Sequence, residues 1–444
     1  MFLRHCIAGG LLAALPALTW AADADIAALR AEIEALRNQY EARIAALEAR
    51  LAQAEQSRAA APAQPAPVNT ATAFNPAMSL ILSGTYANLS QDPASWRLDG
   101  FVPSGGEAGP PPRSFSLGES ELMLAANIDP YLRGEFMLAA APDNSVAVEN
   151  AYLQTLALPQ GLTLKAGRFY SGIGYINEQH PHAWDFVDAP LAQQAFLGGQ
   201  YAQDGVQLKW LAPTETFLEL AAELGRGHNF PGADRNKNGV GAWSLGLRAG
   251  GDLGTSHAWL AGLSYLHTRA RDRRFEAEDV SGNSVSNAFE GRSNLWLASL
   301  VWKWAPGGNP AYRNFKFQTE YYRSREQGSL TYDLDGTALT DGFRSVQSGW
   351  YAQGVYQFMP RWRVGVRYDR LTAGTVDAGA NSGQLPILAP YDPHRTSVMV
   401  DYSPSEYSRF RLQFARDSAR RDATDNQIFL QYVLSLGAHG AHAF

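Results

Sequence analysis

The sequence has 444 residues but only one cysteine, Cys6, and no long apolar run beyond its N-terminus. Disulfide bonds therefore cannot stabilise the fold. Membrane-spanning helices are excluded past the N-terminus, because each needs about 20 consecutive apolar residues. The net charge is −6 and charged residues make up 18% of the chain, which excludes the basic composition of a nucleic-acid-binding protein. A large core or a closed barrel must supply the stability instead.

Residues 1–21 have the pattern of a secretory signal peptide. Arg4 provides the positive charge, an apolar run follows, and Thr19 and Ala21 form a small-residue cleavage site. The apolar run is short for a membrane anchor, and acidic residues follow it directly. Cleavage would also remove Cys6, which would leave an exported chain without cysteine.

A helical coiled coil is predicted over residues 22–56. Apolar residues such as Ile26, Leu29 and Ile33 are spaced three and four apart, as in a heptad seam. Because this stripe is narrow, we expect it to pack against the same helix of other subunits, although a solvated single helix stays an alternative. Residues 57–73 are rich in Pro and Ala and are expected to form a linker.

The sequence pattern of residues 74–444 predicts an all-β transmembrane barrel. Short segments alternate apolar and polar residues and are separated by turn residues, which predicts about sixteen antiparallel strands. Tight turns alternate with long polar connections, such as the one expected at 269–293 between strands 256–268 and 294–305. Short turns on one rim and long loops on the other are typical of barrels in the outer membrane.

The two faces of the predicted strands support a water-filled interior. Val364 and Val366 lie on one face of a predicted strand, whereas Arg363 and Arg367 lie on the other. The apolar face suits lipid, and the charged face suits a wet lumen. Burying such charges unpaired in a dry core would cost several kcal/mol each.

A segment of unusual length, residues 170–201, separates the predicted strands 161–169 and 202–211. It contains no Lys or Arg, and its chemistry-bearing residues are Glu178, His180, His182, Asp185 and Asp188. Its many aromatic residues favour packing over disorder. We therefore expect this loop to fold into the lumen.

With its signal, its coiled coil and the strand ending KAGRF before the long loop, the chain resembles bacterial outer-membrane porins of the phosphate-selective-porin-like group. The resemblance covers residues 74–444. It implies a sixteen-stranded trimer whose third loop narrows the pore and whose coiled coil lies in the periplasm. It also implies that the terminal aromatic residue, Phe444, is read by the barrel-assembly machinery. Phosphate-selective members line the constriction with Arg and Lys, which this loop lacks.

The expected function is passive diffusion of small hydrophilic solutes or ions through the constriction. The acidic loop would face an arginine ladder on the opposite wall, and opposed rows of charge orient polar solutes. The ladder consists of Arg361, Arg363, Arg367, Arg409 and Arg411. Ordinary solvated charges in a wide pore remain the alternative.

Particular residues bear on other functions. His180, His182 and Asp185 could bind Zn²⁺ or Cu²⁺ in a metal-ion-related uptake channel, although histidines that hydrogen-bond a folded loop are the simpler interpretation. No nucleophile elbow indicates an enzyme, and no glycine motif indicates a nucleotide cofactor. The barrel could also anchor a coiled-coil tether between the outer membrane and the cell wall. The expected partners are lipid, small solutes and identical subunits, with no cofactor and no nucleic acid.

Overall fold

The computed structural model describes residues 34, 37–38, 76–105, 108–143, 145–233 and 238–437. The predicted signal peptide and linker, nearly all of the predicted coiled coil, and Phe444 lie outside the described residues. The chain divides into two units, residues 1–73 and 74–444. In the described ranges, no helix combines the length and hydropathy needed to cross a bilayer.

The described part of residues 74–444 forms one antiparallel sheet. Its strands, in chain order, are β1 (Ala77–Leu89), β2 (Ser114–Leu117), β3 (Ser120–Asn127), β4 (Leu132–Ala140), β5 (Val146–Thr155), β6 (Leu162–Tyr170), β7 (Ala202–Leu211), β8 (Phe217–Gly225), β9 (Ala242–Leu253), β10 (His257–Glu278), β11 (Ser284–Trp304), β12 (Asn314–Tyr332), β13 (Leu339–Met359), β14 (Trp362–Asp377), β15 (His394–Ser405), β16 (Ser408–Ser418) and β17 (Asp425–Gly437).

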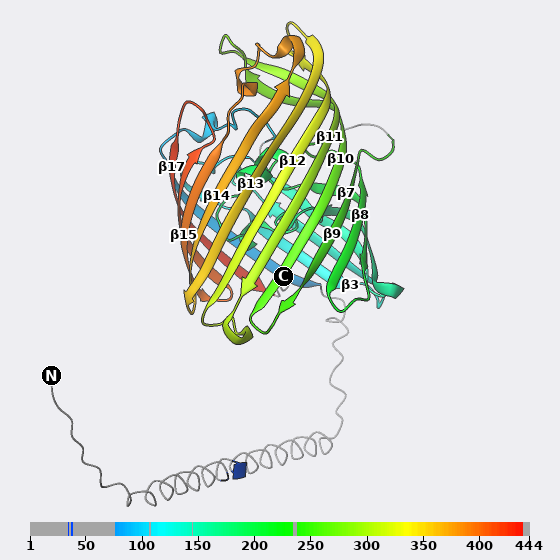
Figure 1. Ribbon diagram of the computed structural model, residues 1–444, viewed down its shortest axis with the longest axis vertical. Coiled ribbons are helices and arrows are strands. Elements are labelled where there is room, and N and C mark those ends of the chain that lie inside the picture. The colour runs from blue at the N-terminus through cyan, green and yellow to red at the C-terminus, as the bar shows by residue number, and fades with distance from the viewer. Residues whose placement is uncertain are drawn as a thin grey trace, which may run out of the picture. The chain divides into compact units, whose positions relative to one another are not determined.

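The sheet closes on itself as a barrel (Figure 1). β1 pairs with β17 on one side, and with both β2 and β3 on the other. β2 and β3 share one position, because β2 pairs with Gly84–Ala87 and β3 with Ala77–Ile81 of the same strand. The barrel therefore has 16 strand positions, which confirms the number predicted from the alternation. Closure leaves no strand edge unpaired, as a membrane-spanning sheet requires.

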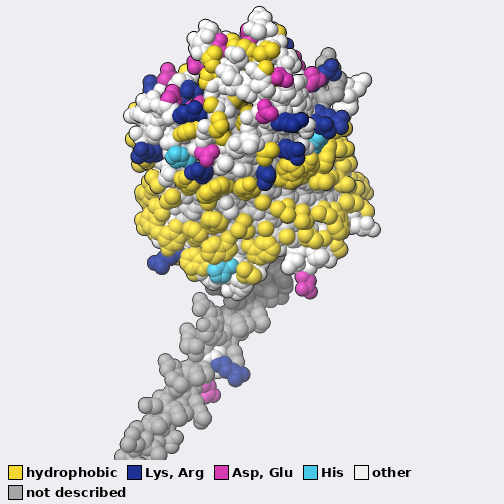
Figure 2. Space-filling view, turned by 45° about the horizontal axis from the view of Figure 1, so that its top comes forward, with side chains coloured by type: hydrophobic (Ala, Val, Ile, Leu, Met, Phe, Trp, Pro, Cys, Tyr) yellow, Lys and Arg dark blue, Asp and Glu magenta, His cyan; other side chains and the backbone are white. Residues whose placement is uncertain are grey.

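An apolar belt surrounds the lower part of the barrel. Leu220, Leu247, Leu263 and Val366 all point outward in it and are each more than a third exposed. Figure 2 shows the belt as a continuous band, with Lys and Arg side chains gathered directly above it. The inward faces of the same strands are polar, so the barrel has the apolar exterior and hydrophilic interior expected of a structure that spans a bilayer.

The strands β10–β14 rise above the belt (Figure 1). β10 has 22 residues, about twice the 9–11 that a membrane-spanning strand needs. β10 and β11 stay paired as far as Glu278 and Ser284, so the long loop predicted at 269–293 is wrong. In this extension Arg274 and Glu276 point outward, while Phe275 is buried in an apolar core inside the barrel. The apolar face has moved from outside to inside, because no lipid surrounds this part.

The belt makes a testable prediction at Leu263, which is 60% exposed. It lies about 20 Å along β10 from His257 at about 3.3 Å per residue, close to the middle of the belt. Leu263→Arg should lower the free energy of unfolding by about 2–4 kcal/mol, because an arginine at the bilayer midplane is poorly solvated. Urea unfolding in lipid vesicles, followed by tryptophan fluorescence, measures the loss.

Glu276→Arg provides the matched control, because Glu276 also points outward from β10 but lies in the extension. It should leave the unfolding free energy within about 0.5 kcal/mol of the wild type. Equal losses for the two variants would contradict the assignment of the belt to lipid.

Candidate channel constriction

The segment between β6 and β7, residues 171–201, lies inside the barrel. It contains a 3₁₀ helix (Pro181–Ala183) and a short α-helix, α2 (Leu191–Leu197), in which every residue is buried. α2 packs against β12, β13 and β14, where Phe196 contacts the ring of Tyr322 at 6.1 Å between centroids. Leu98 and Phe101, from the connection between β1 and β2, belong to the same apolar cluster. Part of the lumen is therefore filled by a dry core.

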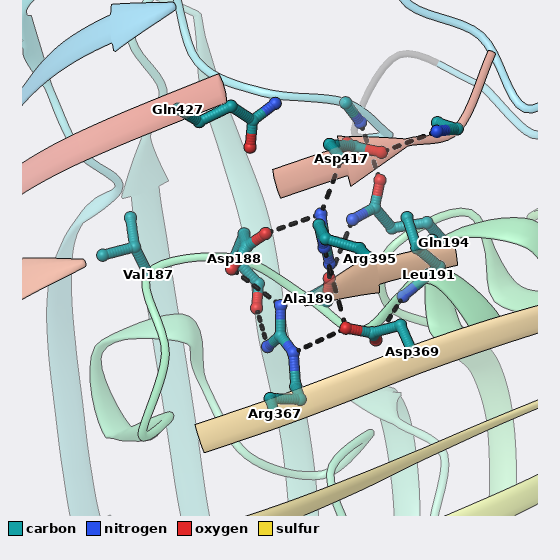
Figure 3. Close-up of polar contacts among 12 residues, drawn as sticks. Val187, Asp188, Ala189, Leu191, Gln194, Arg367, Asp369, Arg395, Asp417 and Gln427 are labelled. Atoms are coloured by element: carbon teal, nitrogen blue, oxygen red, sulfur yellow. Dashed lines mark hydrogen bonds and ion pairs between the residues drawn. The ribbon is translucent and has the colours of Figure 1, made fainter. Parts of the chain in front are cut away.

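Asp188 ties the loop to the wall formed by β14 and β15. Its Oδ1 lies 2.8 Å from Nη2 of Arg367, and its Oδ2 lies 2.6 Å from Nη1 of Arg395. Arg367 also donates to Asp369, and Asp369 accepts the backbone N–H of Leu191 at the start of α2. Figure 3 shows these groups converging on the loop. The network is buried, with the side chain of Arg367 only 1% exposed.

The electrostatics of Asp188 follow from this position. Burial raises the pKa of its carboxyl group, but Arg367 and Arg395 outweigh burial and lower it from 3.8 to about 2. A carboxylate with a lowered pKa stabilises the fold above its ordinary pKa and loses that contribution only as the pH falls toward the lowered value. The anchor therefore persists through the whole neutral and mildly acidic range.

A second anchor lies at Asp185. Its carboxylate lies 3.1 Å from Nη1 of Arg363 and 2.5 Å from Nζ of Lys316 on β12. Arg363 also binds Asp401 on the neighbouring β15. Nearby on β16, Arg409 and Arg411 donate to loop backbone carbonyl groups, those of His182 and Trp184 respectively.

The structure thus brings four of the five ladder arginines onto the loop itself. They are in direct contact with loop atoms, with no water-filled gap between the two rows of charge. Arg361 is different, because it is exposed in the tight turn between β13 and β14. Its backbone carbonyl group accepts a hydrogen bond from Ser403, and its φ is +73°. The arginine row is a docking surface for the loop.

The other loop residues contact different walls. Glu178 lies 3.0 Å from Nζ of Lys209 on β7 and 2.8 Å from Nη1 of Arg248 on β9. Burial alone would raise the pKa of its carboxyl group. Arg248 and Lys209 lower this pKa by a larger amount, so its net shift is downward. His180 and His182 lie on a third side, against Glu121 on β3 and Glu149 on β5. The loop is thus held from three directions.

Two cavities remain beside the loop. The larger one, about 850 Å³, opens among the strand ends that carry the tight turns, and both His180 and His182 line it. The smaller one, about 320 Å³, lies on the other side of the loop and is lined by Glu149, Arg168 and other residues. His180 of the first cavity and Glu149 of the second are only 3.2 Å apart. This His/Glu cluster therefore lies between the two cavities.

Charges of opposite sign line the larger cavity. Glu121 and Glu135 come from β3 and β4, whereas Lys303 and Lys316 come from β11 and β12. The two pairs of strands are half the barrel circumference apart in the strand order. Sequence reasoning missed both lysines as site residues. The sequence does hold one signal for this arrangement, because Glu121 lies on the opposite face of its strand from Leu122 and Leu124.

Comparisons with known proteins identify a relative that is similar in sequence and solved structures that are similar in fold. No model of a known protein family matches the chain. An uncharacterized protein of Aquifex aeolicus (strain VF5) is 32% identical over 352 residues, which cover 75% of this chain and 70% of that protein. This relative has no described activity.

Two solved structures are similar in shape. OmpTdeltaL8, a loop deletion mutant of the Vibrio cholerae outer membrane protein OmpT, is 12% identical, covers 81% of this chain and 98% of its own, and has a TM-score of 0.51. OprB of Pseudomonas putida is 15% identical over 82% of this chain and 94% of its own, with a TM-score of 0.49. At such identity the likeness to the first shows the barrel fold alone.

The anchor at Asp188 can be tested without assuming any transport. Asp188→Asn removes one charge from a buried network, which we expect to weaken loop docking by about 3–5 kcal/mol. The released loop should become a substrate for chymotrypsin, because its aromatic side chains leave their buried positions. Limited proteolysis of the folded barrel, with mass spectrometry of the fragments, locates cleavage within 171–201.

Asp272→Asn serves as the control, because Asp272 is exposed and pairs with Arg274, which is also exposed. It should leave the loop as resistant as in the wild type. A protected loop in Asp188→Asn would show that α2 and the apolar contacts hold the loop without the ion pairs.

Proposed function

We propose that this chain, which belongs to the same family as the uncharacterized Aquifex aeolicus protein, is a porin-like channel of a bacterial outer membrane. It lets small hydrophilic solutes or ions diffuse through a lumen that the loop 171–201 narrows. The observation that carries the proposal is the pair of cavities with charged residues in their walls, one on each side of that loop, inside a closed barrel with an apolar belt. Such cavities need water, and a lumen filled with water can conduct solutes.

The position of the passage follows from where the loop docks. Asp185 and Asp188 hold the loop against β12, β14 and β15. The smaller cavity is lined by Arg168 on β6, and the larger one extends from Glu121 on β3 to the lysines of the opposite wall. Solutes would therefore pass the loop beside the cluster of His180 and Glu149, which lies between the two cavities.

The charges of the larger cavity suggest the solute class. Glu121 and Glu135 on one wall and Lys303 on the opposite wall create a transverse field, which orients dipolar molecules at a narrow point. Lys316 contributes less, because Asp185 neutralises its charge. This arrangement favours zwitterions and small polar solutes. Phosphate selectivity is not part of the proposal, because the cations near the loop are matched by acids.

Assembly belongs to the proposal as well. The resemblance to trimeric porins supports a trimer with a coiled coil in the periplasm, and it supports Phe444 as an assembly signal. Nearly all of the coiled coil, and Phe444, lie outside the described residues. A tether between the outer membrane and the cell wall remains the second candidate, with the barrel as its anchor.

A liposome-swelling assay with the purified full chain separates these functions. We expect vesicles that contain the protein to swell in isotonic solutions of small sugars and amino acids, faster for glycine than for a disaccharide. A plugged anchor would give no swelling above that of empty vesicles, and this result would overturn the channel.

The transverse field predicts the ion preference of a lysine variant. Lys303→Glu reverses one charge on the basic wall, so the reversal potential across a planar bilayer should shift toward cation selectivity. The shift should be large at about 0.01 M salt, where the Debye length is about 30 Å, and small at about 1 M, where it is about 3 Å.

Arg361→Glu makes the same change of charge in the exposed turn between β13 and β14. We expect it to leave the reversal potential within the error of the wild type. If both variants shift the potential equally, the selectivity depends on overall charge and the field across the cavity has no special role.

A further inference from the structure

The cluster between the two cavities contains the donor atoms of a metal site. Nδ1 of His180, a carboxylate oxygen of Glu121 and a carboxylate oxygen of Glu149 all lie within 4.8 Å of one another. Nδ1 of His182 lies 2.8 Å from the other oxygen of Glu121. Two imidazoles and two carboxylates are the ligand types that borderline divalent ions such as Zn²⁺ take in proteins.

The spacing of these atoms suits a small tetrahedral ion. Ligands at about 2.0–2.1 Å from a zinc ion are about 3.3 Å from one another in a tetrahedron. Nδ1 of His180 is 3.2 Å from Oε2 of Glu149 and 3.5 Å from Oε2 of Glu121. Small rotations of the three side chains would therefore place one ion at bonding distance from all three atoms.

The backbone around Glu149 is shaped to bring these groups together. β4 and β5 shift register at Met137 and Leu138, which pair with Asn150 and Val148, so Glu149 is the extra residue of a β-bulge. A bulge turns a side chain away from the direction that simple alternation would give it. Here it lets Glu149 and Asn150 both face the cluster, and the Glu149 side chain is only 9% exposed.

The loop presents its two histidines in a fixed geometry. His180 and His182 flank Pro181, which starts a short 3₁₀ turn. Their rings stack at 5.8 Å between centroids with an angle of 12° between planes. The Nδ1 atoms of both histidines face Glu121. Nε2 of His180 lies 3.4 Å from the side-chain amide of Asn150, which helps to orient the ring.

We propose that His180, Glu121 and Glu149 bind a borderline divalent cation, with Zn²⁺ as the reference ion and His182 beside it as a fourth ligand or a support. Asp185, which the sequence suggested as a ligand, is not part of the site, because it binds Lys316 and Arg363. The ion would join the loop to β3 and β5 between the cavities. Binding at equilibrium does not depend on the proposed channel function, so the two proposals can fail separately.

The test is isothermal titration of the purified, untagged full chain in detergent with ZnCl₂ alone. We expect one site per barrel that is lost or weakened at least about 10-fold in His180→Ala and in Glu149→Gln, the loss typical of disturbed metal sites. X-ray absorption at the zinc edge should show nitrogen and oxygen ligands with imidazole scattering. Resistance of each variant to unfolding in detergent checks that the barrel is intact.

Two further variants separate the proposed site from other histidines. His257→Ala, at the start of β10 where the ring stacks on Trp302, should keep the wild-type affinity. A double variant, His439→Ala with His442→Ala, should keep it as well. The proposal would be overturned if the wild type bound no zinc. It would also be overturned if His180→Ala and Glu149→Gln kept the wild-type affinity, or if only the loss of the C-terminal histidines abolished binding.

Discussion

The buried ion pairs between the loop and the arginines of the wall determine where everything else in the lumen lies. Arg367 and Arg395 are almost completely buried, and a buried cation without a partner costs several kcal/mol. Asp188 meets both, so a loop path that moved it away would leave the two buried cations with only the carboxylates of the wall itself, such as Asp369, to balance their charge. The wall therefore selects one loop conformation from the many that a segment of this length could adopt.

This selection also decides which part of the barrel stays open. Because the loop is held on the side of β14 and β15, α2 and the first connection fill the space beside it with apolar side chains. The remaining space forms two cavities. The smaller one lies beside β5 and β6, and the larger one extends from β3 and β4 across to β11 and β12, with His180 and Glu149 between the two. In the proposed channel, the residues beside the passage are therefore the acids and lysines that the docked loop leaves next to open space, and not the arginines that hold the loop.

The barrel was predictable because each membrane strand repeats the same local rule. Outward residues such as Leu263 must suit lipid and inward residues must suit water, so alternation with a period of two appears in the sequence. This alternation of apolar outward and polar inward residues stops where the barrel extends beyond the lipid. Beyond Arg269 the outward residues of β10 are charged and Phe275 points inward, so the pattern resembled a polar loop although the strand continues.

The site was harder to predict than the barrel, because its contacts join residues far apart in the chain. Composition correctly marked the loop as acidic, and Asp188 does meet Arg367. The partners of Glu178, however, are Lys209 and Arg248, which depend on the path of the loop and not on any local period. Glu149 was missed for a different reason. Asn150 faces inward, so simple alternation along the strand would point the Glu149 side chain outward. Only the β-bulge turns that side chain inward.

The charge of the loop is complementary to each wall that it meets, and this explains its composition. It has no Lys or Arg, which suits contact with the basic groups of β7, β9, β12, β14 and β15 through Glu178, Asp185 and Asp188. Against Glu121 and Glu149 an acid would be repelled, and there the loop presents His180 and His182 instead. Histidine can meet a carboxylate as a hydrogen-bond donor, or share a cation with it. The same requirement that lets the loop dock against an acidic wall therefore also assembles the ligands of a metal site.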